Sequence, residues 1–439
     1  MSVLVRGGLI LTMNDRLDVA EGDVSIRGGR IAAIGADLPG IHDRTIDARG
    51  GYILPGLIQT HIHLCQTLFR GYADDLRLMD WLRTRVWPME AAHTPATLWA
   101  ATRLATTELL SSGTTAVLTM ETVHDTDVVF EAVEESGLRA TIGKCMMDLD
   151  ADVPPRLREP TQASIDESLA IRRRWHTAAG GRLRAAFAPR FAVSCSRELL
   201  EAVADLSGEH DALVHTHASE SQDEQAIVSQ RSGGLTHVEY LNSLRLASPR
   251  LCAAHCVWVD ERERHLLAER DVKVLHCPSS NLKLGSGVAP VVEMRARGIT
   301  VSLGADGAAC NNRLDMFEEM RLAALLQAVR VHPGALPARD VLWMATRAGA
   351  RTLGLGDEIG SIEAGKRADL IVVDRDQPHL VPGPDPYSTL VYGARGSDVR
   401  TTIVDGEVLV DEFQMARVDR AEVVAAARAA ARRLIGAIA

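Results

Sequence analysis

The chain has 439 residues, which is more than one minimal domain needs and enough for a large barrel with a smaller module attached. A net charge of -10, the lack of any basic run and an aromatic content of 4% argue against nucleic acid and anionic membrane surfaces as partners. No stretch reaches about 18 uninterrupted apolar residues and the first residues do not resemble a signal peptide, so the expected location is cytoplasmic.

The first part of the chain predicts short β-strands. Turn residues, mostly paired glycines, interrupt stretches that are rich in aliphatic and β-branched side chains. These predicted strands lie at residues 3–12, 24–34 and 45–54. The opening of the chain is therefore expected to be all β.

The middle of the chain alternates helical patterns with short apolar runs. Helices are predicted at residues 95–112 and 261–270. Runs typical of buried strands lie at residues 116–118, 212–214, 251–254, 272–275 and 299–303. Such alternation over about 300 residues predicts a closed parallel barrel, which places its chemistry at the C-terminal ends of the strands.

The last part returns to strands at 368–410, and an Ala- and Arg-rich stretch at 421–438 predicts one closing helix. The predicted fold class is therefore α/β, a (β/α)8 TIM-type barrel with a small β-sandwich domain built from both chain ends. The two parts of the sandwich are expected at residues 1–55 and 366–415. The barrel is expected at residues 56–365 and the closing helix at residues 416–439.

Ligand-type side chains follow several of the predicted strands. His61 and His63 are two residues apart, so on a strand both point to one face, where two imidazoles can bind one ion. An isolated pair of this kind also arises by chance. Three further runs are followed by His217 with Glu220, by His255 and by Asp306. Together they predict a site of three histidines and one aspartate with an open position for water.

The same positions carry a resemblance to a known family. The segment Leu54-Pro55-Gly56-Leu57 that leads into His61-x-His63, with His217-x-x-Glu220, His255 and Asp306, resembles the pattern of the amidohydrolase superfamily over nearly the whole chain. Segments 63–71, 73–76, 87–90 and 281–284 are most similar to the 5'-deoxyadenosine, methylthioadenosine and S-adenosylhomocysteine deaminase group. The resemblance implies a metal-dependent hydrolytic deaminase that releases ammonia from a purine-type small molecule, and a homo-oligomer, either a dimer or a tetramer.

The resemblance also implies roles for the individual residues. His61, His63, His217 and Asp306 would bind one divalent metal ion, for which Zn2+ is expected first and Fe2+ or Mn2+ are alternatives. Asp306 would also orient the attacking water and take its proton. Glu220 would act as general acid and base, and His255 would position the water.

The residues expected to contact the substrate resemble more than one group of deaminases. Glu90 matches a glutamate that holds ribose hydroxyls, with a structural salt bridge as its alternative. Arg190 stands where adenosine-type deaminases have a histidine, and both it and Gln66 resemble guanine deaminases, so the base preference stays open. Trp81 is expected in the pocket wall, with packing under a loop as its alternative. The same two options apply to Trp87.

Other hypotheses remain beside this one. The chain is alternatively a guanine deaminase, a triazine amino- or chlorohydrolase with a similar site, or a non-catalytic barrel that binds purine or metal. His124, shortly after Glu121, is a further candidate for the site. Ser279, Ser280 and Asn281 are interpreted as a helix-capping segment.

Overall fold

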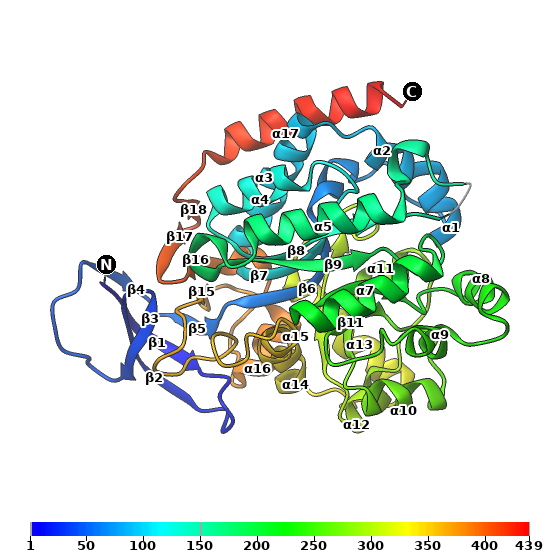
Figure 1. Ribbon diagram of the computed structural model, residues 1–439. Coiled ribbons are helices and arrows are strands. Elements are labelled where there is room, and N and C mark those ends of the chain that lie inside the picture. The colour runs from blue at the N-terminus through cyan, green and yellow to red at the C-terminus, as the bar shows by residue number, and fades with distance from the viewer. Residues whose placement is uncertain (1, 150–151, 439) are drawn as a thin grey trace.

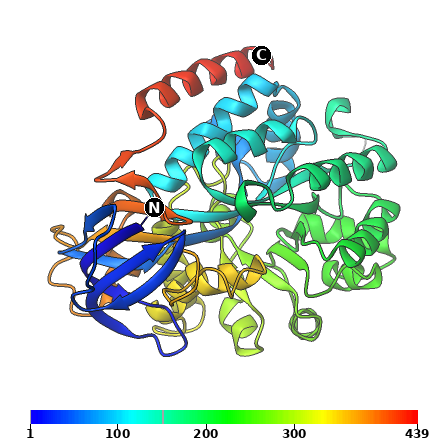
Figure 2. The ribbon, with the colours of Figure 1, turned by 60° about the vertical axis from the view of Figure 1, so that its left-hand side comes forward.

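The computed structural model describes residues 2–149 and 152–438. Two nine-stranded sheets organise it, one parallel and in the middle of the chain, the other mixed and built from both chain ends (Figure 1). In Figure 2 the N-terminal strands and the late strands of the chain lie together at one side of the barrel. The predicted fold class, a barrel with a small β domain from both ends, is confirmed.

The parallel sheet forms the barrel. In chain order its strands are β6 (Leu57–His63), β7 (Thr114–Met120), β8 (Arg139–Met146), β9 (Leu183–Pro189), β10 (Val214–Ala218), β11 (Leu251–His255), β12 (Lys273–His276), β13 (Val301–Leu303) and β14 (Asp306–Gly307). Each strand pairs with the next, from β6 to β13. The sheet then closes, because β14 follows β13 after two residues and pairs in parallel with β6. The ends of β6 and β14 are therefore side by side.

Helices surround the barrel and connect its strands. The α-helices are α1 (Leu78–Trp81), α2 (Trp87–Ala91), α3 (Pro95–Ser111), α4 (Thr126–Ser136), α5 (Thr161–Trp175), α6 (Ala178–Gly181), α7 (Arg197–His210), α8 (Gln222–Ser232), α9 (His237–Ser243), α10 (Glu261–Glu269), α11 (Pro278–Lys283), α12 (Val291–Ala296), α13 (Met316–Arg330), α14 (Ala338–Trp343), α15 (Gly349–Thr352), α16 (Pro386–Ser388) and α17 (Arg420–Gly436). Short 3-10 and π segments are η1 (Leu64–Phe69), η2 (Leu82–Val86), η3 (Pro155–Leu157), η4 (Met344–Ala348), η5 (Thr389–Gly393) and η6 (Gly396–Asp398). The closing helix α17 packs along α3.

The mixed sheet consists of β1 (Ser2–Leu11), β2 (Val19–Arg27), β3 (Arg30–Gly35), β4 (Arg44–Asp47), β5 (Gly51–Pro55), β15 (Leu370–Asp374), β16 (Val399–Val404), β17 (Glu407–Asp411) and β18 (Gln414–Met415). The two chain ends join where β5 pairs antiparallel with β15. The first part of β1 pairs with β4 and its second part with β5, so the sheet branches at this strand. Aliphatic side chains from both ends form a core of their own.

Two barrel strands, β8 and β9, are not among the predicted ones. β8 contains Arg139 and Lys144, and both side chains are buried. Such residues argue against a buried strand in a sequence pattern. The structure pairs Arg139 with Asp369, which is distant in sequence, and Lys144 with Glu159, which lies in a loop. β9 is rich in alanine, which has a low strand propensity.

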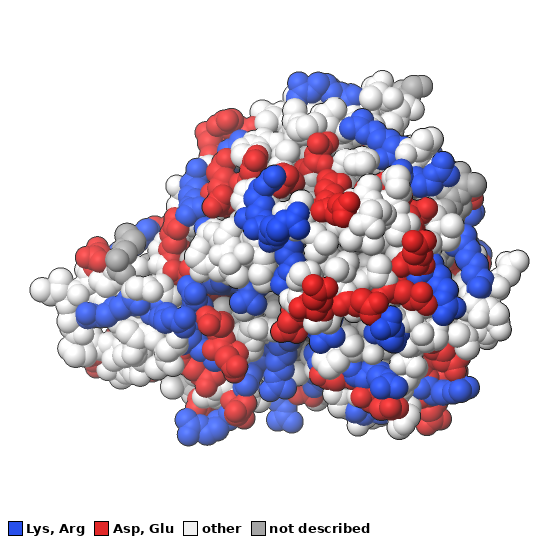
Figure 3. Space-filling view, in the orientation of Figure 1, with Lys and Arg blue, Asp and Glu red and all other residues white. Residues whose placement is uncertain are grey.

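The charges of the surface are mixed. On the face shown in Figure 3, Lys and Arg side chains are interspersed with Asp and Glu. Within the described part of the chain, no helix has both the length and the apolar character needed to cross a membrane. The domain boundaries that the sequence predicts, and the cytoplasmic location, stay predictions.

Candidate metal centre and active site

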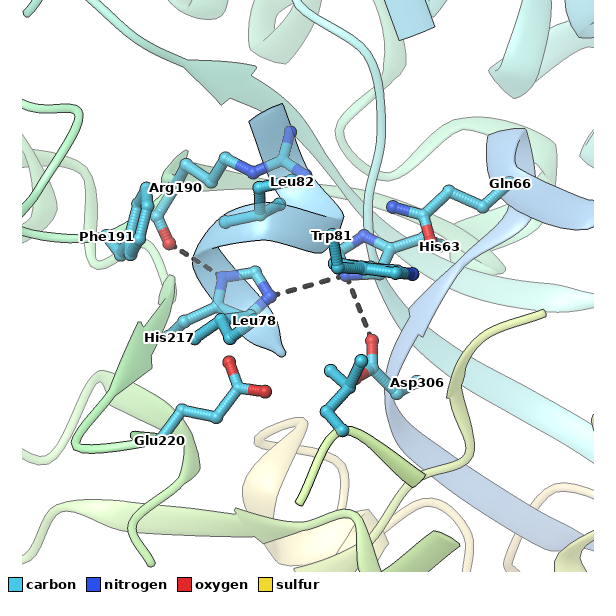
Figure 4. Close-up of a pocket in the computed structure, with 11 residues that line it drawn as sticks. His63, Gln66, Leu78, Trp81, Leu82, Arg190, Phe191, His217, Glu220 and Asp306 are labelled. Atoms are coloured by element: carbon cyan, nitrogen blue, oxygen red, sulfur yellow. Dashed lines mark hydrogen bonds and ion pairs between the residues drawn. The ribbon is translucent and has the colours of Figure 1, made fainter. Parts of the chain in front are cut away.

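The mouth of the barrel gathers four ligand-type side chains. His61 and His63 lie at the end of β6, His217 on β10 and Asp306 at the start of β14. One potential ligand atom from each lies within 4.8 Å of the others. Oδ1 of Asp306 is 3.2 Å from Nε2 of both His61 and His63. The structure thus brings together the four predicted ligands, three of which face one another in Figure 4.

Hydrogen bonds determine which ring nitrogen of His63 and His217 has the proton. Nδ1 of His63 donates to the Met120 carbonyl and Nδ1 of His217 to the Arg190 carbonyl, both at 2.7 Å. Because a carbonyl oxygen only accepts, Nε2 of each neutral ring keeps its lone pair. The two Nε2 atoms are 3.3 Å apart. Their lone pairs repel each other unless a cation binds both, so the residues fit a divalent metal ion.

Burial controls the charge of these groups. It lowers the pKa of His61 to about 4 and the pKa of His217 well below its usual value. Burial also acts to lower the pKa of His63, but the hydrogen bond and charge of Asp306 outweigh it and raise that pKa. Burial acts to raise the pKa of Asp306, yet the neighbouring His61 and His63 bring it well below its usual value. The ionised carboxylate and the neutral His61 and His217 are thus in the state that binds a metal, and a protonated His63 would release a proton on binding.

Glu220 and His255 lie next to the four. Nε2 of His255 is 3.6 Å from Oε2 of Glu220 and 3.8 Å from Oδ2 of Asp306. Within the described chain, Oε1 of Glu220 and Nε2 of His255 have no hydrogen-bond partner. Burial and the charge of Asp306 raise the pKa of Glu220 well above its usual range. Buried polar atoms without partners, facing one space, indicate a place for water or a ligand.

Helix α11 orients two of these groups, which corrects the interpretation of its residues as a helix cap. Oδ1 of Asn281 accepts a hydrogen bond from Nδ1 of His255 at 2.9 Å, and Oγ of Ser280 donates to Oδ2 of Asp306 at 2.7 Å. The N-cap position is Cys277, and no side chain caps the helix there. That interpretation is wrong because α11 follows β12 after one residue, so Ser280 and Asn281 lie inside the helix and their side chains reach residues of β11 and β14.

His215 is a residue of the site that sequence reasoning did not identify. It is fully buried on β10, and its Nε2 lies 2.6 Å from Nδ1 of His61. The signal was present, since His215 and His217 repeat the spacing of His61 and His63 and therefore point to one face of their strand.

A narrow cavity adjoins the four ligand-type residues. Its lining includes His63, His217, Glu220 and Asp306, together with Gln66, Leu78, Trp81, Leu82, Arg190, Phe191 and Leu284. Trp81, Gln66 and Arg190 therefore line this cavity, and their contact with a substrate stays a prediction. Apolar side chains from the segment around α1 supply much of the wall, which suits a flat ring.

Glu90 lies behind this wall. Its carboxylate accepts two hydrogen bonds from the Arg190 guanidinium, and Oε1 also accepts one from Nε2 of Gln66 at 2.9 Å. Burial acts to raise the pKa of Glu90, but the charge of Arg190 outweighs it and lowers that pKa. In this conformation Glu90 forms a buried salt bridge, the alternative noted from the sequence, and its ribose contact stays a prediction.

The two remaining candidates lie elsewhere. Trp87 is fully buried in the main hydrophobic core, which corresponds to its packing alternative. Nε2 of His124 donates to the Arg156 carbonyl at 2.7 Å. His124 also lies near Glu159 and Glu167, and both of these carboxylates form ion pairs with Lys144.

The fold and the geometry define a TIM-type barrel with a candidate metal centre at its mouth. Residues 52–409 match the model of the Amidohydrolase family. The chain is 44% identical over 437 residues to a 5'-deoxyadenosine deaminase of Methanothermobacter thermautotrophicus, covering 99% of both chains. It is 39% identical over 444 residues to a 5-methylthioadenosine/S-adenosylhomocysteine deaminase of Pelotomaculum thermopropionicum, covering 99% of both.

A solved structure supports the same relationship. A zinc-bound adenosine deaminase from Xanthomonas campestris superposes with a TM-score of 0.93 at 34% identity, over 99% of this chain and 98% of that one. The chain therefore belongs to the amidohydrolase family. The predicted family membership is confirmed, and the names of these relatives agree with the predicted class, a hydrolase that deaminates a cyclic amidine.

Proposed function

We propose that the protein is a metal-dependent hydrolytic deaminase that releases ammonia from a purine-type ring. The observation that supports it most is the convergence of three imidazole Nε2 atoms and one carboxylate, buried at the wall of a cavity that also exposes Glu220. A binding module has no need for a buried proton carrier beside such a centre. We take this as the reason to prefer an enzyme over a non-catalytic barrel.

His61, His63, His217 and Asp306 would hold one divalent ion, which we propose to be Zn2+. When bound, such an ion lowers the pKa of its water from about 16 to about 7. Asp306 is placed to take the proton of that water, since its Oδ1 lies 3.2 Å from Nε2 of both His61 and His63, while its Oδ2 accepts from Ser280 and lies 3.8 Å from Nε2 of His255.

Glu220 and His255 would act on the substrate side. Burial and the charge of Asp306 raise the pKa of Glu220 well above its usual range, which favours its protonated form. Glu220 can deliver its proton to a ring nitrogen, accept one from the hydroxyl group newly added to the ring carbon, and pass it to the departing ammonia. Asn281 holds Nδ1 of His255, so that Nε2 points at Glu220 and Asp306. His255 would thereby position the attacking water.

For the substrate we propose 5'-deoxyadenosine, 5'-methylthioadenosine, S-adenosylhomocysteine or adenosine, because relatives of 44% and 39% identity are named for the first three. The ring would lie against Trp81, with the amine-bearing carbon next to the four ligands. Arg190 and Gln66 would contact the rest of the molecule. Glu90 would reach the ribose only after releasing one of its present hydrogen bonds.

One contact favours a second candidate, guanine. Because Nε2 of Gln66 donates to the Glu90 carboxylate, the amide is oriented with Oε1 as an acceptor, and Oε1 has no partner within the described chain. An acceptor in the wall suits a ring N–H donor. Guanine has a ring donor at N1 and a further donor in its 2-amino group, whereas N1, N3 and N7 of an adenine nucleoside only accept.

Ammonia release from zinc-loaded protein tests both candidates. The four adenine compounds and guanine are assayed separately, with a chlorotriazine as a further arm. We expect turnover of at least one purine and none after His61→Ala combined with His217→Ala. A protein that holds zinc yet releases ammonia from none of the purines would contradict the proposed function. Dechlorination of the triazine alone would replace it by the other hydrolase hypothesis.

The fate of the metal is a separate readout. Elemental analysis should find about one ion per chain in the wild type and a large loss in the double variant. Retention of the ion by that variant would contradict the proposed coordination. We further propose a homo-oligomer, a dimer or tetramer, which light scattering can test.

A further inference from the structure

The three ligand histidines are held by acceptors of two kinds. Nδ1 of His63 and of His217 donates to a backbone carbonyl. Nδ1 of His61 instead lies 2.6 Å from Nε2 of a second imidazole, His215. The two rings meet edge to face, with centroids 4.8 Å apart and planes at 90°, and both are fully buried.

This difference matters because an imidazole, unlike a carbonyl, can either accept or donate. The hydrogen bond between His61 and His215 can form in two ways, with its proton on Nδ1 of His61 or on Nε2 of His215. If Nε2 of His215 donated it, a neutral His61 would have its own proton on Nε2 and could not bind an ion there. If Nδ1 of His61 donates it, Nε2 keeps a lone pair, 3.2 Å from Oδ1 of Asp306.

The two other ligand histidines favour the second arrangement, because each has its proton on Nδ1 and a lone pair on Nε2 directed at the same centre. The remaining nitrogen of the His215 ring, Nδ1, is buried and has no hydrogen-bond partner within the described structure. A neutral His215 with its proton on Nδ1 has a lone pair on Nε2, and this lone pair faces Nδ1 of His61.

We propose that His215 is a positioning residue of the metal centre. By accepting a hydrogen bond from Nδ1 of His61, it holds His61 in the tautomer and ring orientation whose Nε2 can bind a divalent ion. His215 does not itself bind the ion or the substrate. The inference rests on the proposed metal-dependent function and adds a residue that this function needs.

Two substitutions separate an acceptor from a space-filling side chain. His215→Leu removes the acceptor and leaves Nδ1–H of His61 buried without a partner, which weakens metal sites about 10- to 100-fold. His215→Gln places an amide oxygen near the position of Nε2 and should restore most of the affinity. Zinc affinity is measured on purified protein by competition with a chromophoric chelator.

A matched control shows what the loss of a buried imidazole does by itself. His93 is also buried, but its hydrogen-bond partners are the Cys65 carbonyl and the Thr97 hydroxyl. His93→Leu should keep the zinc affinity of the wild type. Wild-type affinity in His215→Leu would overturn the proposal, as would a loss in His215→Gln as large as that in His215→Leu.

A spectroscopic measurement covers the case in which His215→Leu does not fold. In zinc-loaded wild-type protein with ¹⁵N-labelled histidine, His61 should have a proton on Nδ1 and a zinc-bound Nε2. The opposite tautomer would overturn the proposal. The outcome is distinct from a failure of the proposed function, because a wild type that binds zinc but deaminates no purine would leave these affinity and tautomer results intact.

Discussion

At the scale of single residues, Glu220 combines two properties of a proton carrier. Its burial and the nearby charge of Asp306 raise its pKa well above the usual range, and its Oε1 is unpaired within the described chain. Its backbone N–H donates to Oε2 of Glu224 at 2.6 Å, which fixes the turn before α8. The side chain is therefore held at the cavity by backbone contacts and remains free to exchange a proton.

Glu220→Gln tests this role. The amide has nearly the same shape and should leave the four ligand-type residues undisturbed, but it cannot transfer a proton. We expect zinc content like the wild type and a kcat lower by about 10²- to 10⁴-fold. Steady-state ammonia release and elemental analysis provide the two readouts. An unchanged kcat would remove Glu220 from proton transfer.

A second prediction concerns Glu319, a buried residue of α13. Burial raises its pKa to about 7, although Ser279 and Asn311 donate hydrogen bonds to it. A raised folded-state pKa means that stability is fully present below the unfolded value, near 4.5, and is lost as the pH rises through about 7.

The size of this effect is measurable. Over that window the group should reduce the free energy of unfolding by about 1.4 kcal/mol per pH unit. Glu319→Gln should remove this part of the slope. Urea unfolding of the metal-free protein at several pH values between 5 and 7 measures it, and equal slopes in the two proteins would contradict the prediction.

At the scale of elements, the strand ends are shaped for the site. His255 and Asp306 have φ angles of 72° and 62°, in the left-handed region that side chains other than glycine seldom adopt. Such strain costs about 1–3 kcal/mol per residue and persists where packing imposes it. The strained residues lie where β11 ends and where β14 begins. In this conformation both side chains point toward the mouth of the barrel.

Gly304, between β13 and β14, permits the close approach to β6. A Cβ atom there would lie 2.6 Å from the carbonyl oxygen and 2.7 Å from the nitrogen of His61. Gly304→Ala should displace His61, reduce zinc content and lower stability by about 1–3 kcal/mol. Gly436 in α17 has no described atom near the corresponding position, so Gly436→Ala is the control. A melting temperature and a zinc content like those of the wild type in Gly304→Ala would contradict the prediction.

At the scale of the whole molecule, one buried ion pair joins the barrel to the domain from the chain ends. Arg139 at the start of β8 donates to both oxygens of Asp369, at 2.7 and 3.0 Å, and both side chains are buried. Asp369 also accepts from the Asp405 backbone. Removing one partner leaves an uncompensated charge, which is costly in such a place.

Arg139→Met should therefore lower the free energy of unfolding by about 3–5 kcal/mol. Combining it with Asp369→Asn should cost less than the sum of the two single changes, because neither charge is then left alone. Denaturant unfolding followed by tryptophan fluorescence measures the cycle. Arg197→Met removes an exposed pair with Glu201 and should change little. Strict additivity of the two buried changes would contradict a direct coupling.

The sequence by itself determined the class of fold and most of the metal centre. Spacing of two residues within a strand, and ligand-type residues directly after apolar runs, make candidates of all the residues at the site except His215, because a parallel barrel brings its strand ends together whatever the loops between them do. The family resemblance then assigned His61, His63, His217 and Asp306 to the metal, and Glu220 and His255 to the water and the protons. These signals are local, so they can be recognised without any knowledge of tertiary contacts.

Tertiary structure alone decided which groups surround those residues. The acceptor of His61 is His215, the group that holds His255 is Asn281, and Glu90 is bound to Arg190, one hundred positions away in the chain. It also decided that β8 can bury Lys144. Hydrogen bonds and ion pairs between distant segments depend on distances of a few tenths of an ångström, which no periodicity in the sequence encodes.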